Sequence, residues 1–195
     1  MAYQLIGSAP SPFTRRLRLL MENTPHEFRA LDIYSPPGAA ELKRLNPTNQ
    51  IPVLIDNGQT VFDSRVIFNH LNQRHQFETM TIEKENALTV AEGMMNGGVA
   101  WFLMVKRSGV DPQGQMMYLN RQIERMQTTH EWLMQWLLTP AAKEWNFVTM
   151  TVYAAYDWMK FRDIHAGAKT SEVADFLSLH QHRPSIQATD PRKLS

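Results

Sequence analysis

Residues 46–64 read NPTNQIPVLIDNGQTVFDS, and the order of their turn, strand and cap signals indicates the fold. Val53–Asp56 and Gln59–Phe62 are two β-type runs on either side of Asn57-Gly58. Asn-Gly between such runs predicts a tight hairpin, because both central positions of a type I′ turn need a positive φ. Asp63-Ser64 follows at once and is typical of a helix start, where side-chain oxygens cap free backbone N–H groups. The stretch therefore predicts a hairpin that leads directly into a helix.

The residues before this stretch alternate strand and helix signals. Tyr3–Gly7 predicts a first strand, and the turn that follows it ends at Pro12, a residue suited to the first turn of a helix. Residues 27–33 predict a second strand, and residues 39–45 a short helix. The whole order predicts a small α/β domain with a mixed sheet, over residues 1–76.

From about residue 79 the pattern becomes helical only, which predicts an all-α helical-bundle domain over residues 82–195. The composition shift at 73–81 is the expected boundary between the two domains. We expect the polar tail after Arg183-Pro184 to wrap over the protein or to fray. Four helices are predicted: one over 87–105, one that starts at Asp111-Pro112 and ends at Thr139-Pro140, one over 149–162, and one over Ser171–His180.

Composition excludes several classes of function. The formal net charge is +1, without the basic stripe that nucleic acid requires. The chain has no cysteine, so a thiol that takes part in chemistry must come from a ligand. No histidine pair has the spacing of a metal site, and no apolar stretch approaches the roughly 18 residues of a membrane span. We therefore expect no metal, no nucleic acid and no membrane partner, and a cytoplasmic location.

Ser11 is the first candidate site residue. It precedes a predicted helix, where free N–H groups and the positive end of the helix dipole favour an anion such as a thiolate. Taken alone, Ser11 is better explained as an ordinary N-cap serine.

Two further segments are candidates. If the Ile51-Pro52 bond is cis, the backbone of Ile51 faces outward and can pair with an extended peptide; the alternative is a plain edge proline in the trans form. Asp63-Ser64 suits the head group of an α-amino acid, because the hydroxyl and N–H of Ser64 can hold a carboxylate and Asp63 an ammonium. The alternative there is a doubled helix cap.

The joint order of these features resembles the cytosolic glutathione S-transferases, especially bacterial serine-type members. The matching segments are 11–18 (SPFTRRLR), 46–54 (NPTNQIPVL) and 62–64 (FDS), with Tyr156-Asp157-Trp158 and residues 183–186 near the end. The resemblance implies a thioredoxin-like N-terminal domain and a helical C-terminal domain. It also implies that glutathione is the co-substrate and that two copies of the chain form a homodimer.

The resemblance further implies a role for each site residue. Ser11 would be the catalytic residue that donates a hydrogen bond to the glutathione thiolate. Ile51 would pair through its backbone with the cysteinyl part, with Pro52 cis, and Asp63 and Ser64 would hold the γ-glutamyl end. Two further binding residues are implied: Gln50, towards the glycyl end, and Phe13, beside Ser11.

Three departures from the family pattern stand out. Asp63 replaces the commoner glutamate, the chain is slightly short, and Val152 stands where a capping aspartate would follow Thr149 at a helix start. The sequence thus predicts a glutathione transferase that conjugates glutathione to a small apolar electrophile, as in detoxification. A non-catalytic binding protein with this fold, or a glutathione-dependent isomerase or peroxidase, remains an alternative.

Overall fold

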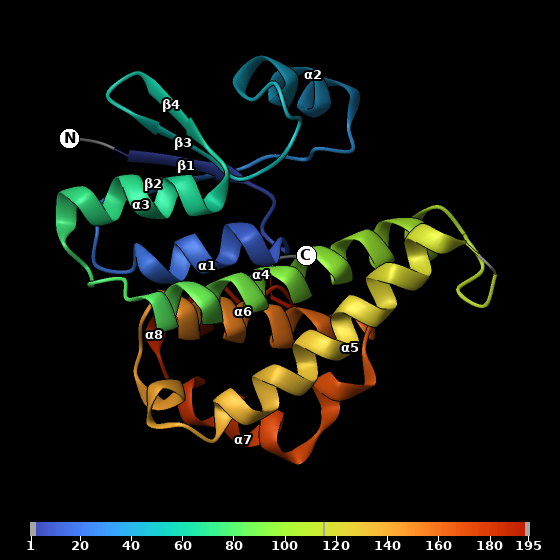
Figure 1. Cartoon of the computed structure of the whole chain (residues 1–195). Helices are drawn as coiled ribbons and strands as arrows, with labels where there is room; N and C mark the ends of the chain where they lie inside the picture. The colour runs from blue at the N-terminus through green and yellow to red at the C-terminus, as the bar shows by residue number, and fades with distance from the viewer. Residues whose placement is uncertain (1–2, 115, 194–195) are drawn as a thin grey trace. The chain divides into compact units, whose positions relative to one another are not determined.

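The computed structural model describes residues 3–114 and 116–193, and the chain divides into two compact units (Figure 1). The first unit comprises Met1–Thr79 together with Pro184–Ser195, and the second comprises Met80–Arg183. The expected boundary at 76–82 falls close to the division at Thr79. The segment after Arg183, which the sequence analysis assigned to the helical domain, belongs instead to the first unit.

The first unit contains a four-stranded mixed sheet in the order β2-β1-β3-β4 (Figure 1). β1 and β2 are parallel, and β1–β3 and β3–β4 are antiparallel. Asn57 and Gly58 have φ of 48° and 85°, as the hairpin between β3 and β4 requires. The predicted thioredoxin-like arrangement is confirmed. The strands are β1 Tyr3–Gly7, β2 His26–Ala30, β3 Val53–Asp56 and β4 Gln59–Phe62, and the helices are α1 Pro12–Leu20, α2 Pro36–Leu45 and α3 Ser64–His75.

Two elements of this unit have bounds that differ from the prediction. β2 ends at Ala30, because its pairing with β1 stops where β1 ends at Gly7. α2 begins at Pro36 rather than at residue 39, since Ser35 accepts a hydrogen bond from the N–H of Gly38 and the prolines fit the first turn. Residues 36–38, which lie between the predicted strand and the predicted helix, thus form the capped start of α2.

The C-terminal segment is fixed to α1. It contains the short helix α8, Pro184–Ala188. Arg15 of α1 is only 2% exposed and donates to the hydroxyl of Thr189 at 3.2 Å and to the carbonyl of Ile186 at 3.5 Å. Glu22 accepts the backbone N–H of Ser185 at 3.0 Å. These bonds explain why the segment packs on the first unit.

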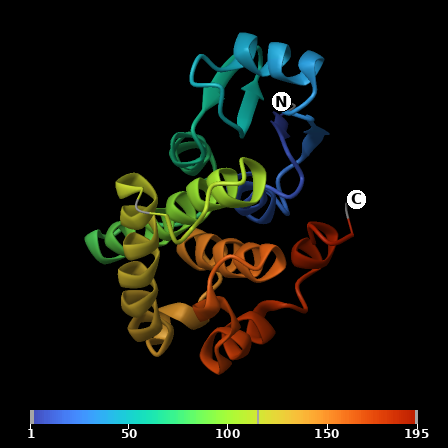
Figure 2. The ribbon, with the colours of Figure 1, turned by 90° about the vertical axis from the view of Figure 1, so that its right-hand side faces the viewer.

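The second unit is helical, and its long helix α4 packs against both α5 and α6 (Figure 2). α4 and α6 approach closely at Gly98, where a Cβ would lie 2.5 Å from the terminal methyl group of Met159, so a larger residue there would displace that flexible side chain. The α-helices of this unit are α4 Ile82–Trp101, α5 Met117–Leu137, α6 Phe147–Arg162 and α7 Ser171–His180; a π-helical turn, η1 Phe102–Arg107, continues α4, and two 3-10 turns are η2 Pro140–Lys143 and η3 Ala166–Lys169.

Two predicted helix starts in the second unit are wrong. α5 begins at Met117 rather than at Asp111-Pro112, because Asp111 forms a turn in which its carbonyl accepts the N–H of Gly114. α6 begins at Phe147 with Asn146 as its cap, and Asn146 accepts hydrogen bonds from both the N–H and the hydroxyl of Thr149. Val152 cannot cap the helix as an aspartate at that position would. Asn146, before the first turn of α6, accepts the N–H of Thr149 and caps the helix instead.

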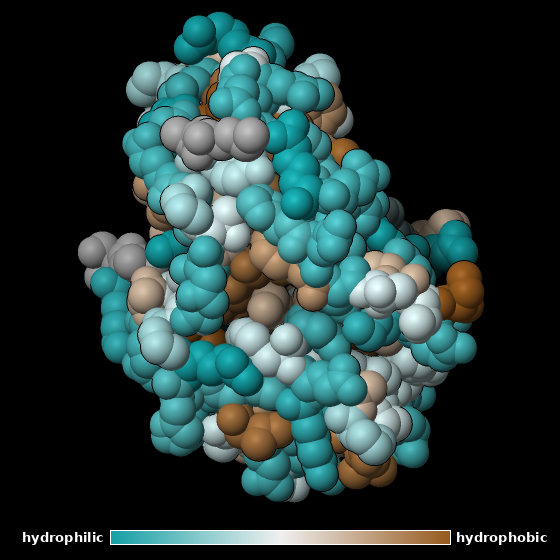
Figure 3. All heavy atoms as spheres, turned by 90° about the vertical axis from the view of Figure 1, so that its left-hand side faces the viewer, coloured by the Kyte–Doolittle hydropathy of each residue, from teal (hydrophilic) through white to brown (hydrophobic). Residues whose placement is uncertain are grey.

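Among the described residues, one helix is long and apolar enough to cross a membrane by length and composition, over Ile82–Arg107. No such stretch was expected from the sequence. A single such helix is weak evidence for a membrane span, because the core helix of a soluble protein passes the same test; 33% of its apolar window is buried. Figure 3 shows one face of the surface, on which hydrophilic residues predominate and hydrophobic ones form small patches.

Candidate functional site

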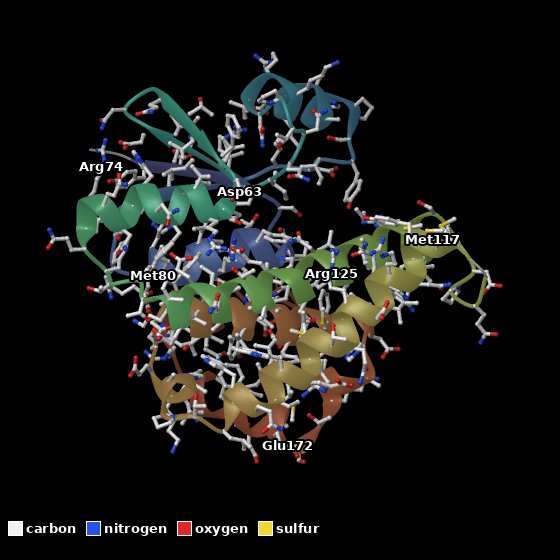
Figure 4. All side chains as sticks on the ribbon, viewed as in Figure 1. Asp63, Arg74, Met80, Met117, Arg125 and Glu172 are labelled. Carbon is white, nitrogen blue, oxygen red and sulfur yellow. The ribbon has the colours of Figure 1, made fainter. Side chains whose placement is uncertain are left out.

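The register of the sheet brings the three predicted segments to one end of it. Ile6 near the end of β1 pairs with Val53 at the start of β3, and Val53 pairs with Phe62 at the end of β4. The turn to Ser11 leaves β1 at this end, Ile51-Pro52 enters β3 there, and Asp63-Ser64 leaves β4 there. Figure 4 shows Asp63 at the first turn of α3.

Ser11 is the N-cap of α1, and it is partly buried. Its Oγ accepts the backbone N–H of Thr14 at 3.3 Å, so the hydroxyl keeps its own proton available as a donor. Phe13, also partly buried, lies in the first turn of the same helix, with its ring centre 5.5 Å from the guanidinium carbon of Arg16. The geometry thus gives Ser11 one free proton at the positive end of a helix dipole.

The loop before β3 presents unpaired backbone. The Ile51-Pro52 bond is cis. Within the described part of the chain, no hydrogen bond uses the backbone N–H or C=O of Ile51, so both groups can pair with an added extended segment. Gln50 before it is exposed, and Asn49 adopts the left-handed conformation with φ of 56°.

Asn46 holds this loop in shape, a role that sequence reasoning did not assign. It is 1% exposed, and its amide nitrogen donates to the carbonyl of Gln50 at 2.7 Å. Its amide oxygen accepts both the N–H and the hydroxyl of Thr48 at 2.9 Å. The Asn46-Pro47 pair was the available signal, since an amide side chain beside a proline is typical of a turn with its own internal hydrogen bonds.

Asp63 joins β4 to α3 in an unusual backbone conformation, with φ of 68° and ψ of 127°. A positive φ costs a non-glycine residue about 1–3 kcal/mol and is concentrated at functional sites. The Oδ1 atom of Asp63 caps α3 by accepting the N–H groups of Arg65 and Val66, at 2.8 and 3.3 Å. The residue is exposed, so its carboxylate can reach a ligand.

Ser64 is the first residue of α3 and is 2% exposed, which leaves little of it accessible. Its Oγ accepts a hydrogen bond from Nη2 of Arg16 at 2.6 Å. Arg16 lies in the segment 11–18 that resembles the family. Its position in the sequence did not predict this contact with a residue 48 positions away.

Other polar clusters lie away from this end of the sheet. Asp56 at the far end of β3 is buried and binds His70 at 2.7 Å and Arg74 at 3.1 Å, and Figure 4 shows Arg74 near the last turn of α3. In the second unit, His130 contacts the hydroxyl of Tyr156 at 2.9 Å. Burial lowers the pKa of His130 and raises that of Tyr156. Both clusters are explained by packing.

Within residues 3–114 and 116–193, no group of three or more histidine, aspartate or glutamate side chains could hold a metal ion. A cavity of about 380 Å³ lies beside α2 and borders the loop that carries Gln50. Its lining residues are Ile33, Ala39, Ala40, Leu42, Lys43 and Asn49.

Solved structures resemble this chain over almost its whole length. A glutathione transferase family member from Pseudomonas fluorescens Pf-5, with bound glutathione, has a TM-score of 0.79 at 23% identity and covers 97% of this chain and 98% of its own. The chain has the glutathione transferase fold. A glutathione S-transferase from Methylobacterium radiotolerans, in complex with glutathione sulfonate, has a TM-score of 0.82 at 19% identity, over 98% and 95% of the two chains.

Sequence comparison points the same way. Residues 5–79 match the model of the family described as "Glutathione S-transferase, N-terminal domain". The GST-like protein YibF of Escherichia coli is 26% identical over 178 residues, which cover 84% of this chain and 85% of the relative. The chain is therefore similar to glutathione S-transferases in its first unit and to a GST-like protein over most of its length.

Proposed function

We propose that this protein is a serine-type glutathione transferase that binds glutathione in its first unit and conjugates it to a small apolar electrophile. The observation that carries the proposal is the sheet register. It brings a hydroxyl at a helix start, unpaired backbone at Ile51 and an acidic helix cap to one end of the sheet. Solved structures of the same fold have bound glutathione or glutathione sulfonate, which supports the choice of ligand.

Each part of glutathione has a matching group in this arrangement. The backbone of Ile51 would pair with the cysteinyl residue as an added strand. The N–H and hydroxyl of Ser64 would hold the γ-glutamyl carboxylate, and the exposed Asp63 its ammonium. Gln50 would reach the glycyl end, and Phe13 would line the site beside the sulfur.

The chemistry belongs to the ligand thiol. Ser11 would donate its hydroxyl proton in a hydrogen bond to the thiolate, and the N-terminus of α1 would add its positive potential. Lowering the thiol pKa from about 9 to about 7 requires about 2.7 kcal/mol, which one charge-assisted bond and a helix end can supply. The thiol proton passes to solvent. The sulfur then forms a bond to an electron-poor carbon of the electrophile. The electron pair displaced from that carbon departs with a leaving group in a substitution, or takes up a proton in an addition.

Calorimetric titration of the whole chain with glutathione tests the binding step, with S-methylglutathione as a second ligand. We expect saturable binding of both ligands, because neither the backbone pairing nor the carboxylate contacts need the free thiol. Absence of binding at millimolar glutathione would refute the proposal. Turnover with an aryl halide then separates a transferase from a binding protein that lacks catalysis.

A glutathione-dependent isomerase is a second candidate function. A Caenorhabditis elegans relative named "Probable maleylacetoacetate isomerase" is 28% identical over 60 residues, or 31% of this chain and 28% of that protein. In an isomerisation the thiolate adds to the substrate and is released, so glutathione is not consumed. Measuring glutathione before and after turnover distinguishes the two reactions.

The expected homodimer and cytoplasmic location stay predictions. Sedimentation of the purified chain tests the first of them, since a dimer doubles the mass found in solution. Fractionation of cells that express the chain tests the second.

A further inference from the structure

Arg16 is a buried arginine that contacts Ser64, the proposed carboxylate-binding residue, and it has no role in the proposed function. Arg16 on α1 is 1% exposed, and it donates from Nη2 to Oγ of Ser64 at 2.6 Å. Such a short contact is typical of a charge-assisted hydrogen bond. It joins two helices, α1 and α3, which pack against each other in the first unit.

The direction of this bond fixes what Ser64 can do. A guanidinium has only donors, so Oγ of Ser64 must accept from Arg16 and its own proton must point elsewhere. In the part of the chain that the structure describes, no hydrogen bond uses the backbone N–H of Ser64, as is usual for the first residue of a helix. Ser64 therefore keeps two donors that no described residue uses, an O–H and an N–H, and both suit a carboxylate.

Arg16 also contributes a permanent positive charge, because a guanidinium stays protonated in proteins. This charge lies directly behind the hydroxyl and favours an anion in front of it. The ring of Phe13 lies 5.5 Å from the guanidinium carbon and helps to hold the side chain in place. Ser11 caps the helix that carries Arg16, so the same helix positions both the thiol and the carboxylate ends of the ligand.

We propose that Arg16 is a positioning residue that makes Ser64 selective for the α-carboxylate of the γ-glutamyl group. This inference rests on the proposed function, since it assumes that glutathione binds in the first unit. Arg16 acts through Ser64 and does not touch the ligand.

The experiment measures the affinity of the whole chain for two probes. One is glutathione, and the other is γ-aminobutyryl-cysteinyl-glycine, which lacks only the α-carboxylate. For Arg16→Met we expect glutathione affinity to fall by at least about tenfold, while affinity for the second probe changes by less than about twofold. In a Ser64→Ala background Arg16→Met should add little further loss, since the two residues act as one unit.

Two variants keep the result interpretable. Arg18→Met is the matched control, because Arg18 lies on the same helix but packs over the ring of Phe28 at 4.1 Å; we expect it to leave both affinities unchanged. Arg16→Lys retains a charge and a donor, so it should fold and recover part of the selectivity even if Arg16→Met does not fold.

Three results overturn this inference. They are an equal loss for both probes, additive losses in the double variant, and a wild-type chain that binds the two probes equally well. A wild-type chain that binds neither probe would refute the proposed function itself. The two failures are therefore distinguishable.

Discussion

Replacing Ser11 by alanine tests whether its hydroxyl acts on the ligand or only caps a helix. The bond from the Thr14 N–H to Ser11 Oγ is long, at 3.3 Å, so its loss should cost about 0.5–1 kcal/mol of stability, the low end for an N-cap. A hydrogen bond to a bound thiolate is stronger, about 1.5–3 kcal/mol. At about 1.36 kcal/mol per pKa unit, its loss should raise the pKa of bound glutathione by about one to two units.

Ultraviolet absorbance of the thiolate, followed against pH, measures this pKa directly. The chain has no cysteine, so every thiolate observed comes from glutathione. S-methylglutathione provides the blank. A matching loss is expected in turnover near pH 7, about fivefold to fiftyfold for a pKa raised from about 7 by one to two units, with the rate recovering at higher pH.

Ser35→Ala is the matched control, because Ser35 caps α2 in nearly the same geometry. Its Oγ accepts the N–H of Gly38 at 3.2 Å, and a proline follows it as one follows Ser11. Ser35 also donates from Oγ to the carbonyl of Asp32 at 2.8 Å, so we expect Ser35→Ala to cost at least as much stability and to leave the pKa of bound glutathione unchanged. If the two variants give the same thiol pKa, Ser11 is only a cap and the reasoning fails.

Three further outcomes are expected. Asp63→Asn keeps the helix cap but removes the charge, so glutathione should bind several-fold more weakly by calorimetry with the melting temperature nearly unchanged; equal affinity would remove Asp63 from the site. Burial lowers the pKa of His130, His165 and His180 below the ordinary 6.5, so below that pH the unfolded chain binds protons that the folded helical unit does not. Its free energy of unfolding, measured in urea, should therefore fall as the pH drops from about 7 to about 5, by at most about 1.4 kcal/mol per pH unit for each histidine, and a flat profile would contradict this. Gly98→Val should lower the free energy of unfolding by about 1–3 kcal/mol, because the valine side chain would overlap the side chains of α6. An unchanged urea midpoint would show that α6 rearranges without loss of stability.

Most of the fold could be predicted from local sequence patterns. The Asn57-Gly58 turn and the capped start of α3 were predictable, because each depends on adjacent residues with strong backbone preferences. The start of α6 was not, since Asn146 and Thr149 both have the chemistry of a cap and only packing selects between them.

The segments that form the candidate site were predictable from the sequence, but the side-chain contacts between them were not. Ser11 and Ile51-Pro52 could be placed at one end of a sheet from strand order alone. The bond from Arg16 to Ser64 could not, because it depends on the rotation of two helices about their axes, and no spacing in the sequence encodes that. The packing of the C-terminal segment on α1 could not be predicted for a similar reason. In the sequence Arg15 is an ordinary helix arginine, and only the structure shows its hydrogen bond to Thr189.

That docking has a consequence for the order in which the protein is made. During translation α8 leaves the ribosome only after the whole helical unit, Met80–Arg183, has been synthesised. The bonds from Arg15 to Ile186 and Thr189, and from Ser185 to Glu22, cannot form before then. The first unit is thus completed after the helical unit has been synthesised, and α1, which Ser11 caps, reaches its final packing only when residues 185–189 have emerged.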